Sequence, residues 1–165
     1  MKFHFFAAIL LVLFGIGSVQ SNDFRIKTKN EFPPLSHYKD VEAFERHNKE
    51  YIQICLEYTG GGSGSIPCLI NYELWDRELN IYYKELSGKL DDAGKKVLKQ
   101  SQIAWLKERD LSFRLNALLL NKVYKNKKGA EYSLMRAGDA DKLMVPLVKQ
   151  RALYLRNASG ILGDP

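Results

Sequence analysis

The two cysteines, Cys55 and Cys68, constrain this chain more than any other feature of its sequence. They stand 13 positions apart. A run rich in glycine and serine, TGGGSGSIPC over residues 59–68, starts shortly after Cys55 and ends at Cys68. Such a run suits an interdomain linker, a phosphate-binding loop or a loop closed by a disulfide. A phosphate-binding loop follows a strand and carries a lysine after its glycines, and this run has neither. A disulfide would tie the segments on both sides together, which argues against a linker between separate domains.

Residues 1–21 have the layout of a secretory signal peptide. Lys2 precedes an apolar stretch from Phe5 to Ile16, and small residues follow as far as Ser21. A membrane anchor is the alternative, but a spanning helix needs about 20 apolar residues and this stretch is shorter. We therefore expect cleavage near Ser21 and a periplasmic or secreted protein without stable membrane insertion. In an oxidising compartment, two cysteines most simply form one disulfide.

The composition fits one globular domain and excludes several classes of partner. Cleavage would leave 144 of the 165 residues, enough for a single core. The net charge is +6, and the densest basic cluster is KVYKNKK over residues 122–128. This cluster lacks the interleaved aromatic side chains of a single-strand binder, so we expect no nucleic-acid partner. His37 and His47 are too few for a closed metal site, so we expect no metal and no cofactor.

Apolar residues recur three or four positions apart over most of the chain, and no alternating strand pattern interrupts them. We therefore predict an all-α single domain of about four helices over residues 37–158. Residues 22–36 would be a flexible arm and residues 159–165 a tail. The expected helices cover residues 37–58, 68–90, 92–125 and 139–158, the last starting as late as Val145 because of Pro146. The second and third would form a long antiparallel hairpin, joined to the first by the Cys55–Cys68 disulfide.

Polar and aromatic residues lie on one face of each hairpin helix. A turn near Asp92 would place residues whose numbers sum to about 185 opposite each other. The facing pairs would then be Asp76 with Arg109, Asn80 with Trp105, and Tyr83 with Gln102. We expect direct contacts between them that fix the register of the hairpin. No nucleophile stands beside a base in these motifs, so we expect no catalytic residue and no enzyme.

These motifs resemble the N-terminal domain of the LprI-type lysozyme inhibitors, formerly a domain of unknown function. The resemblance spans about residues 50–158. The matching positions are Cys68, Asp76, Leu79, Asn80, Tyr83, Leu86, Gln102, Trp105, Arg109, Asp110, Arg151 and Leu155. Family members often carry a second cysteine pair, and here Phe113 occupies one of its positions. The glycine–serine run is an insertion relative to the family pattern.

The resemblance implies an exported, non-enzymatic protein that inhibits a protein partner, foremost a cell-envelope hydrolase such as lysozyme. The alternative is a periplasmic immunity protein that neutralises a secreted antibacterial effector, either a phospholipase or a wall hydrolase. Typical lysozymes are basic, so the positive charge of this chain opposes their encounter unless acidic groups compensate. The candidate partner-binding residues form the loop Gly60, Gly61, Gly62, Ser63, Gly64, Ser65 and Ile66.

Overall fold

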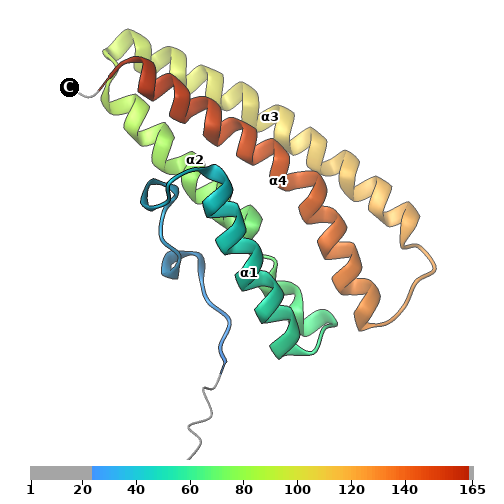
Figure 1. The fold of residues 1–165 in the computed structure, drawn as a ribbon. Helices are drawn as coiled ribbons and strands as arrows, with labels where there is room; N and C mark the ends of the chain where they lie inside the picture. The colour runs from blue at the N-terminus through green and yellow to red at the C-terminus, as the bar shows by residue number, and fades with distance from the viewer. Residues whose placement is uncertain (1–23, 164–165) are drawn as a thin grey trace, which may run out of the picture.

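Residues 24–163 fold as four α-helices. A computed structural model describes residues 24–163, so the predicted signal peptide and its cleavage site lie outside the described range. The helices are α1 (Val41–Thr59), α2 (Asn71–Gly88), α3 (Asp92–Val123) and α4 (Ala130–Ile161) (Figure 1). Three short 3-10 segments, η1 (Lys29–Glu31), η2 (Leu35–His37) and η3 (Ser63–Cys68), complete the order, without a strand in residues 24–163. The predicted all-α class is confirmed.

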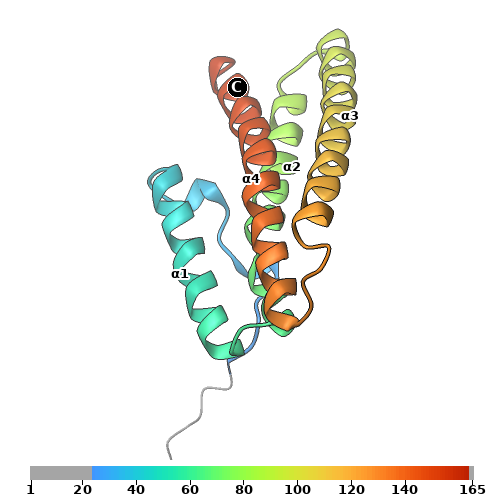
Figure 2. The ribbon, with the colours of Figure 1, turned by 90° about the vertical axis from the view of Figure 1, so that its right-hand side faces the viewer.

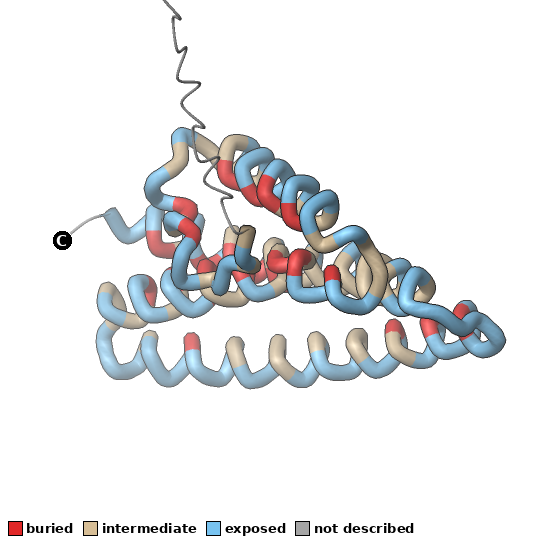
Figure 3. Tube along the Cα trace, turned by 90° about the horizontal axis from the view of Figure 1, so that it is seen from below, coloured by how far each residue is buried: buried red, intermediate tan, exposed pale blue. Residues whose placement is uncertain are grey.

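The helices alternate in direction, with α1 and α3 on opposite sides of the α2–α4 pair (Figure 2). The closest pairing joins α2 to α4, while α3 lies nearer to α4 than to α2. Buried residues gather where α1, α2 and α4 meet, and α3 is largely exposed (Figure 3). The Phe44 ring of α1 meets the Trp75 ring of α2 edge to face, with 5.2 Å between their centroids. None of the helices in residues 24–163 is long and apolar enough to cross a membrane.

Aspartate side chains define where two helices begin. The Asp40 carboxylate accepts a hydrogen bond from the Ala43 N–H at 2.7 Å, and Asp91 accepts one from the Gly94 N–H at 2.8 Å. Such caps satisfy amide groups that have no partner within the helix. The cap at Asp40 starts α1 four residues later than the predicted start at residue 37. Gly60 ends α1 in the left-handed conformation, with φ of 69°, which glycine adopts without a steric penalty.

The prediction for the last helix was wrong at both ends. α4 begins at Ala130, not near residue 139 or Val145, and it continues to Ile161 into the predicted tail. Pro146 lies within the helix. The early turns are held by small and apolar residues, Ala137, Ala140 and Met144, which share a groove with Leu120 of α3. This packing between distant segments is invisible to local periodicity.

The N-terminal segment packs on the core and is not the flexible arm that the sequence suggested. Phe32 and Leu35 are buried among the core residues. The Arg77 guanidinium of α2 donates hydrogen bonds to the carbonyl oxygens of Lys29 and Phe32, both at 2.7 Å, and to that of Pro33 at 3.0 Å. The Arg77 side chain thus supplies hydrogen bonds that these carbonyl oxygens would otherwise form with water.

The glycine–serine run forms an ordered corner between α1 and α2. The Cys55–Cys68 disulfide closes it, with 5.6 Å between the Cα atoms, which confirms the predicted link. Gly60, Gly61 and Gly62 all have positive φ, and the chain then enters η3. The buried Ser65 hydroxyl lies 2.6 Å from the Thr59 hydroxyl. The loop is therefore a built element rather than a flexible span.

We predict that the disulfide stabilises the fold by restricting the unfolded chain. The double variant C55S/C68S should lose about 3 kcal/mol of unfolding free energy, the value typical of a ring of this size. Urea denaturation followed by circular dichroism measures the loss. Gly64→Ala is the matched control in the same loop, because the added methyl meets no atom within 4 Å. An unchanged urea midpoint in C55S/C68S would contradict the prediction.

The ion pair between Arg77 and Glu78 should be essential because Glu78 is fully buried. Arg77 Nη2 lies 2.7 Å from Glu78 Oε1. Arg77→Ala leaves a buried carboxylate without its counter-charge, so we expect a loss of about 3–5 kcal/mol in urea denaturation. The double variant R77A/E78Q carries no such charge and should recover part of that loss. Equal losses in the single and double variants would show that the charge is not the cause.

Candidate functional site

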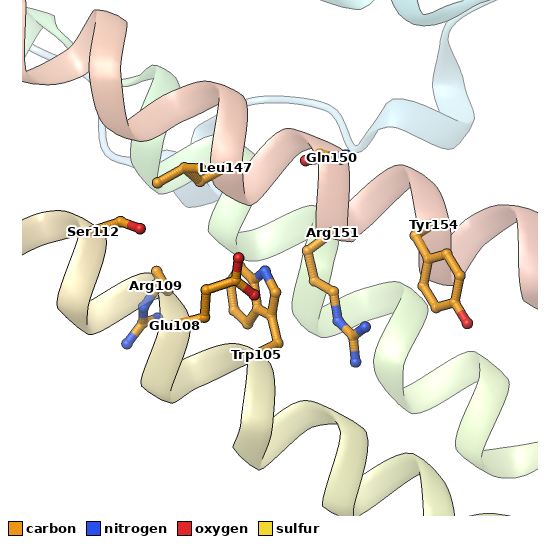
Figure 4. Close-up of a pocket in the computed structure, with 8 residues that line it drawn as sticks. All are labelled: Trp105, Glu108, Arg109, Ser112, Leu147, Gln150, Arg151 and Tyr154. Carbon is orange, nitrogen blue, oxygen red and sulfur yellow. The ribbon is translucent and has the colours of Figure 1, made fainter.

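Two cavities flank the inner face of α3, and Trp105 and Arg109 line both. The α3–α4 cavity has a volume of about 290 Å³ and is open to solvent on one side. Its lining residues are Trp105, Glu108, Arg109, Ser112, Leu147, Gln150, Arg151 and Tyr154 (Figure 4). The α2–α3 cavity measures about 320 Å³. Its lining includes the predicted facing residues together with Leu79, Lys99, Ile103 and Leu106.

The structure brings the predicted facing residues together but does not join them. Asp76, Asn80, Tyr83, Gln102, Trp105 and Arg109 all line the α2–α3 cavity, so the two predicted faces meet there. Within residues 24–163, however, no ion pair or hydrogen bond links the three pairs across it. The predicted contacts are wrong because α3 stands away from α2 and leaves the cavity between them.

Four of these side chains instead find partners elsewhere. Asn80 Nδ2 donates to the Asp76 carbonyl oxygen at 2.7 Å on its own helix. Arg109 donates to Oδ1 of the adjacent Asp110, at 3.0 Å from Nε and 2.7 Å from Nη2. Gln102 Oε1 accepts from Arg151 Nε of α4 at 3.0 Å. The family motif therefore connects α3 to α4 rather than to α2.

Arg151 is the central side chain of this site, and only 9% of its surface is exposed. Its Nε binds Gln102, and its Nη2 donates to the Ser101 hydroxyl at 3.1 Å. Its guanidinium carbon lies 5.9 Å from the centroid of the Trp105 ring and 5.3 Å from that of Tyr154. Burial lowers the pKa of Arg151 from its ordinary value, and the nearby Tyr154 and Tyr83 oppose this shift. In the described part of the chain, no carboxylate lies within 4.0 Å of it.

Sequence reasoning found Arg151 only as a matching family position. Its partners Ser101 and Gln102 lie about 50 positions earlier, so no local pattern joins them. The side chains around both cavities are mainly cationic, aromatic, amide, hydroxyl and aliphatic groups, with one carboxylate in each lining. No group of three or more histidine, cysteine or acidic side chains in residues 24–163 is placed to hold a metal ion.

The candidate loop Gly60–Ile66 offers less surface than expected. Ser65 is fully buried, so it is not available to a partner. Ile66, the expected apolar anchor, lines the groove formed by α3 and α4 beside Leu120 and Met144. The remaining exposed positions of the loop are Gly60, Ser63 and Gly64. The loop thus presents mainly backbone to a partner.

A broad apolar surface appears instead on the outer face of α3. Seven of the sixteen exposed large hydrophobic side chains in the described chain belong to this helix, so α3 is the main apolar surface. Leu111, Leu115 and Leu118 are more than half exposed and lie on one face, at spacings of four and three. The inner face instead buries Leu98, Asn116 and Leu120. The helical period of the sequence includes these leucines, but it does not show that they face outward.

The fold defines a small all-helical protein closed by a disulfide. The family model described as "Lysozyme inhibitor LprI" matches residues 67–155, which is more than half of the chain. The protein therefore belongs to the LprI family of lysozyme inhibitors. No curated protein and no solved structure matches it. The family and the disulfide together indicate an extracytoplasmic protein.

We predict that Gln102 stabilises the fold more than Asp76 does. Gln102→Ala removes the acceptor of the buried Arg151 Nε–H, so about 1–3 kcal/mol should be lost. Asp76→Ala should cost less than about 1 kcal/mol, because its side chain accepts only a 3.3 Å bond from Asn80 within the described residues. Urea denaturation of both variants measures the difference. A larger loss for Asp76→Ala would restore the predicted Asp76–Arg109 contact.

Proposed function

We propose that this protein is exported through residues 1–21 and inhibits a lysozyme-type hydrolase by direct binding, without catalysis of its own. The observation that carries the proposal is the family match, which covers α2, α3 and most of α4. The matched region includes both cavities and the exposed apolar face of α3. An inhibitor needs a stable surface of this kind rather than a reactive group.

The outer face of α3 is the surface we assign to the hydrolase. We call Leu111, Leu115 and Leu118 the leucine face. Exposed apolar patches on small proteins commonly mark surfaces that bind other proteins. The leucine face lies on a straight helix at the edge of the molecule, so a partner reaches it without moving other elements (Figure 2). The glycine-rich loop lacks such side chains.

The charge of the two proteins shapes their encounter. The chain carries a net charge of +6, and Arg114 and Lys122 lie close to the leucine face in sequence. A basic lysozyme would therefore be repelled at long range and held at short range by apolar contact. Salt screens repulsion between exposed charges. Association with a basic lysozyme should accordingly become faster as salt is added.

A lytic assay with purified mature protein tests the function and the assigned face together. Wild-type protein should suppress lysis of bacterial cell walls by a basic lysozyme. The double variant L111E/L118E should lose this inhibition by about tenfold or more, because central apolar contacts dominate interface energies. Val97→Glu, an equally exposed apolar position far along the same helix, is the matched control and should inhibit normally.

The two parts of the proposal fail separately in this assay. Undiminished lysis at a large excess of folded wild-type protein would overturn lysozyme inhibition. Full inhibition by L111E/L118E would leave the function intact and overturn the leucine face as the contact. Circular dichroism of both variants establishes that each is folded.

A further inference from the structure

We infer that the α3–α4 cavity binds the carboxylate of a small cyclic acid, such as a sugar acid, with Arg151 as its counter-charge. This inference does not depend on the inhibition of a lysozyme. It follows from a buried cation that lacks an anion, at the wall of a cavity open to solvent.

Buried charges in proteins are normally paired because their desolvation is costly. Arg151 departs from this rule. It is about nine-tenths buried, and its partners Gln102 and Ser101 are both neutral. Arg109 in the same cavity differs, since Asp110 already neutralises it. Glu108 also lines the cavity, but it forms no ion pair with Arg151, so Arg151 is the cation of this cavity that lacks a carboxylate within 4.0 Å in residues 24–163.

The guanidinium of Arg151 also has free hydrogen-bonding capacity. Nε and Nη2 have protein acceptors, while Nη1 makes no hydrogen bond within residues 24–163. Arg151 and Tyr154 reach from α4 toward α3, and Trp105 and Glu108 rise toward them from α3 (Figure 4). A carboxylate that enters the cavity can accept a charge-assisted hydrogen bond from the Nη1 group of Arg151.

The other walls indicate which molecule carries the carboxylate. Trp105 and Tyr154 provide two aromatic surfaces for the face of a ring, and Gln150 and Ser112 provide polar groups for hydroxyls. The volume of about 290 Å³ suits a single small ring. The Glu108 carboxylate lies in the same lining and disfavours a doubly charged phosphate. A singly charged acid on a hydroxylated ring satisfies all of these groups.

Nuclear magnetic resonance titration of the folded protein with glucuronate and with glucose tests this inference. The two sugars differ by a carboxylate in place of a hydroxymethyl group. Glucuronate should shift the indole N–H signal of Trp105 and bind about ten- to hundredfold more tightly than glucose, as one charge-assisted bond implies. Trp75 lies in the core and serves as an internal control, because its signal should not move.

Two arginine variants separate the roles of the cations. Arg151→Gln should weaken glucuronate binding by about tenfold or more, whereas Arg114→Gln, an exposed arginine of the same charge that lines neither cavity, should change it by less than about threefold. Equal weakening in both variants would overturn the assignment to Arg151. The wild-type titration needs no variant, so the inference is testable even if Arg151→Gln does not fold.

Inorganic phosphate distinguishes a carboxylate site from a general anion site. In the same titration, phosphate should bind at least about tenfold more weakly than glucuronate. Equal affinity for phosphate, equal affinity for glucose, or no shift of the Trp105 signal would each overturn the inference.

Discussion

The pairing of α2 with α4 is the constraint on which the rest of the structure depends. These two helices run in the same direction, so the chain must return between them through α3 (Figure 1). Leu74 and Trp75 of α2 and Val148, Ala152 and Leu155 of α4 are nearly or fully buried in the shared core. Because α2 and α4 bury their apolar faces against each other, little apolar surface is left for α3 to cover.

The position of α3 follows from this arrangement. Only Leu98, Asn116 and Leu120 are buried in a helix of 32 residues. The middle of its inner face carries Gln102, Trp105 and Arg109, whose bulk and polarity hold the helix away from its neighbours. Both cavities lie beside this stretch. The two cavities are thus a consequence of the few buried residues that hold α3 against its neighbours.

Much of the fold could be predicted from the sequence because its signals are local. The apolar period of α2 and α3 is uninterrupted, Asp91 marks the start of α3, and two cysteines allow one pairing. The facing of α2 and α3 was also predictable, since a short turn leaves few alternatives. These signals place Gln102, Trp105 and Arg109 on one face, and the structure confirms it.

The parts that could not be predicted depend on contacts between distant segments. The early start of α4 rests on its packing against the end of α3, and no cap residue announces it. The leucine face and the inner face of α3 share the same helical period, so period alone cannot orient them. The partner of Gln102 lies 49 positions away on α4. For these features, the tertiary arrangement decides between alternatives that are locally equivalent.

The two buried charges in residues 24–163, Glu78 and Arg151, show how stability and binding are divided. Glu78 is balanced inside the protein, because Arg77 pairs with it and also holds the N-terminal segment through three carbonyl groups. Arg151 has neutral partners and faces a cavity. An ion pair whose two charges neutralise each other inside the protein contributes to the fold and leaves no free charge for a ligand. A cation without its anion destabilises the empty site, and the same free energy then favours the carboxylate that we propose to enter it.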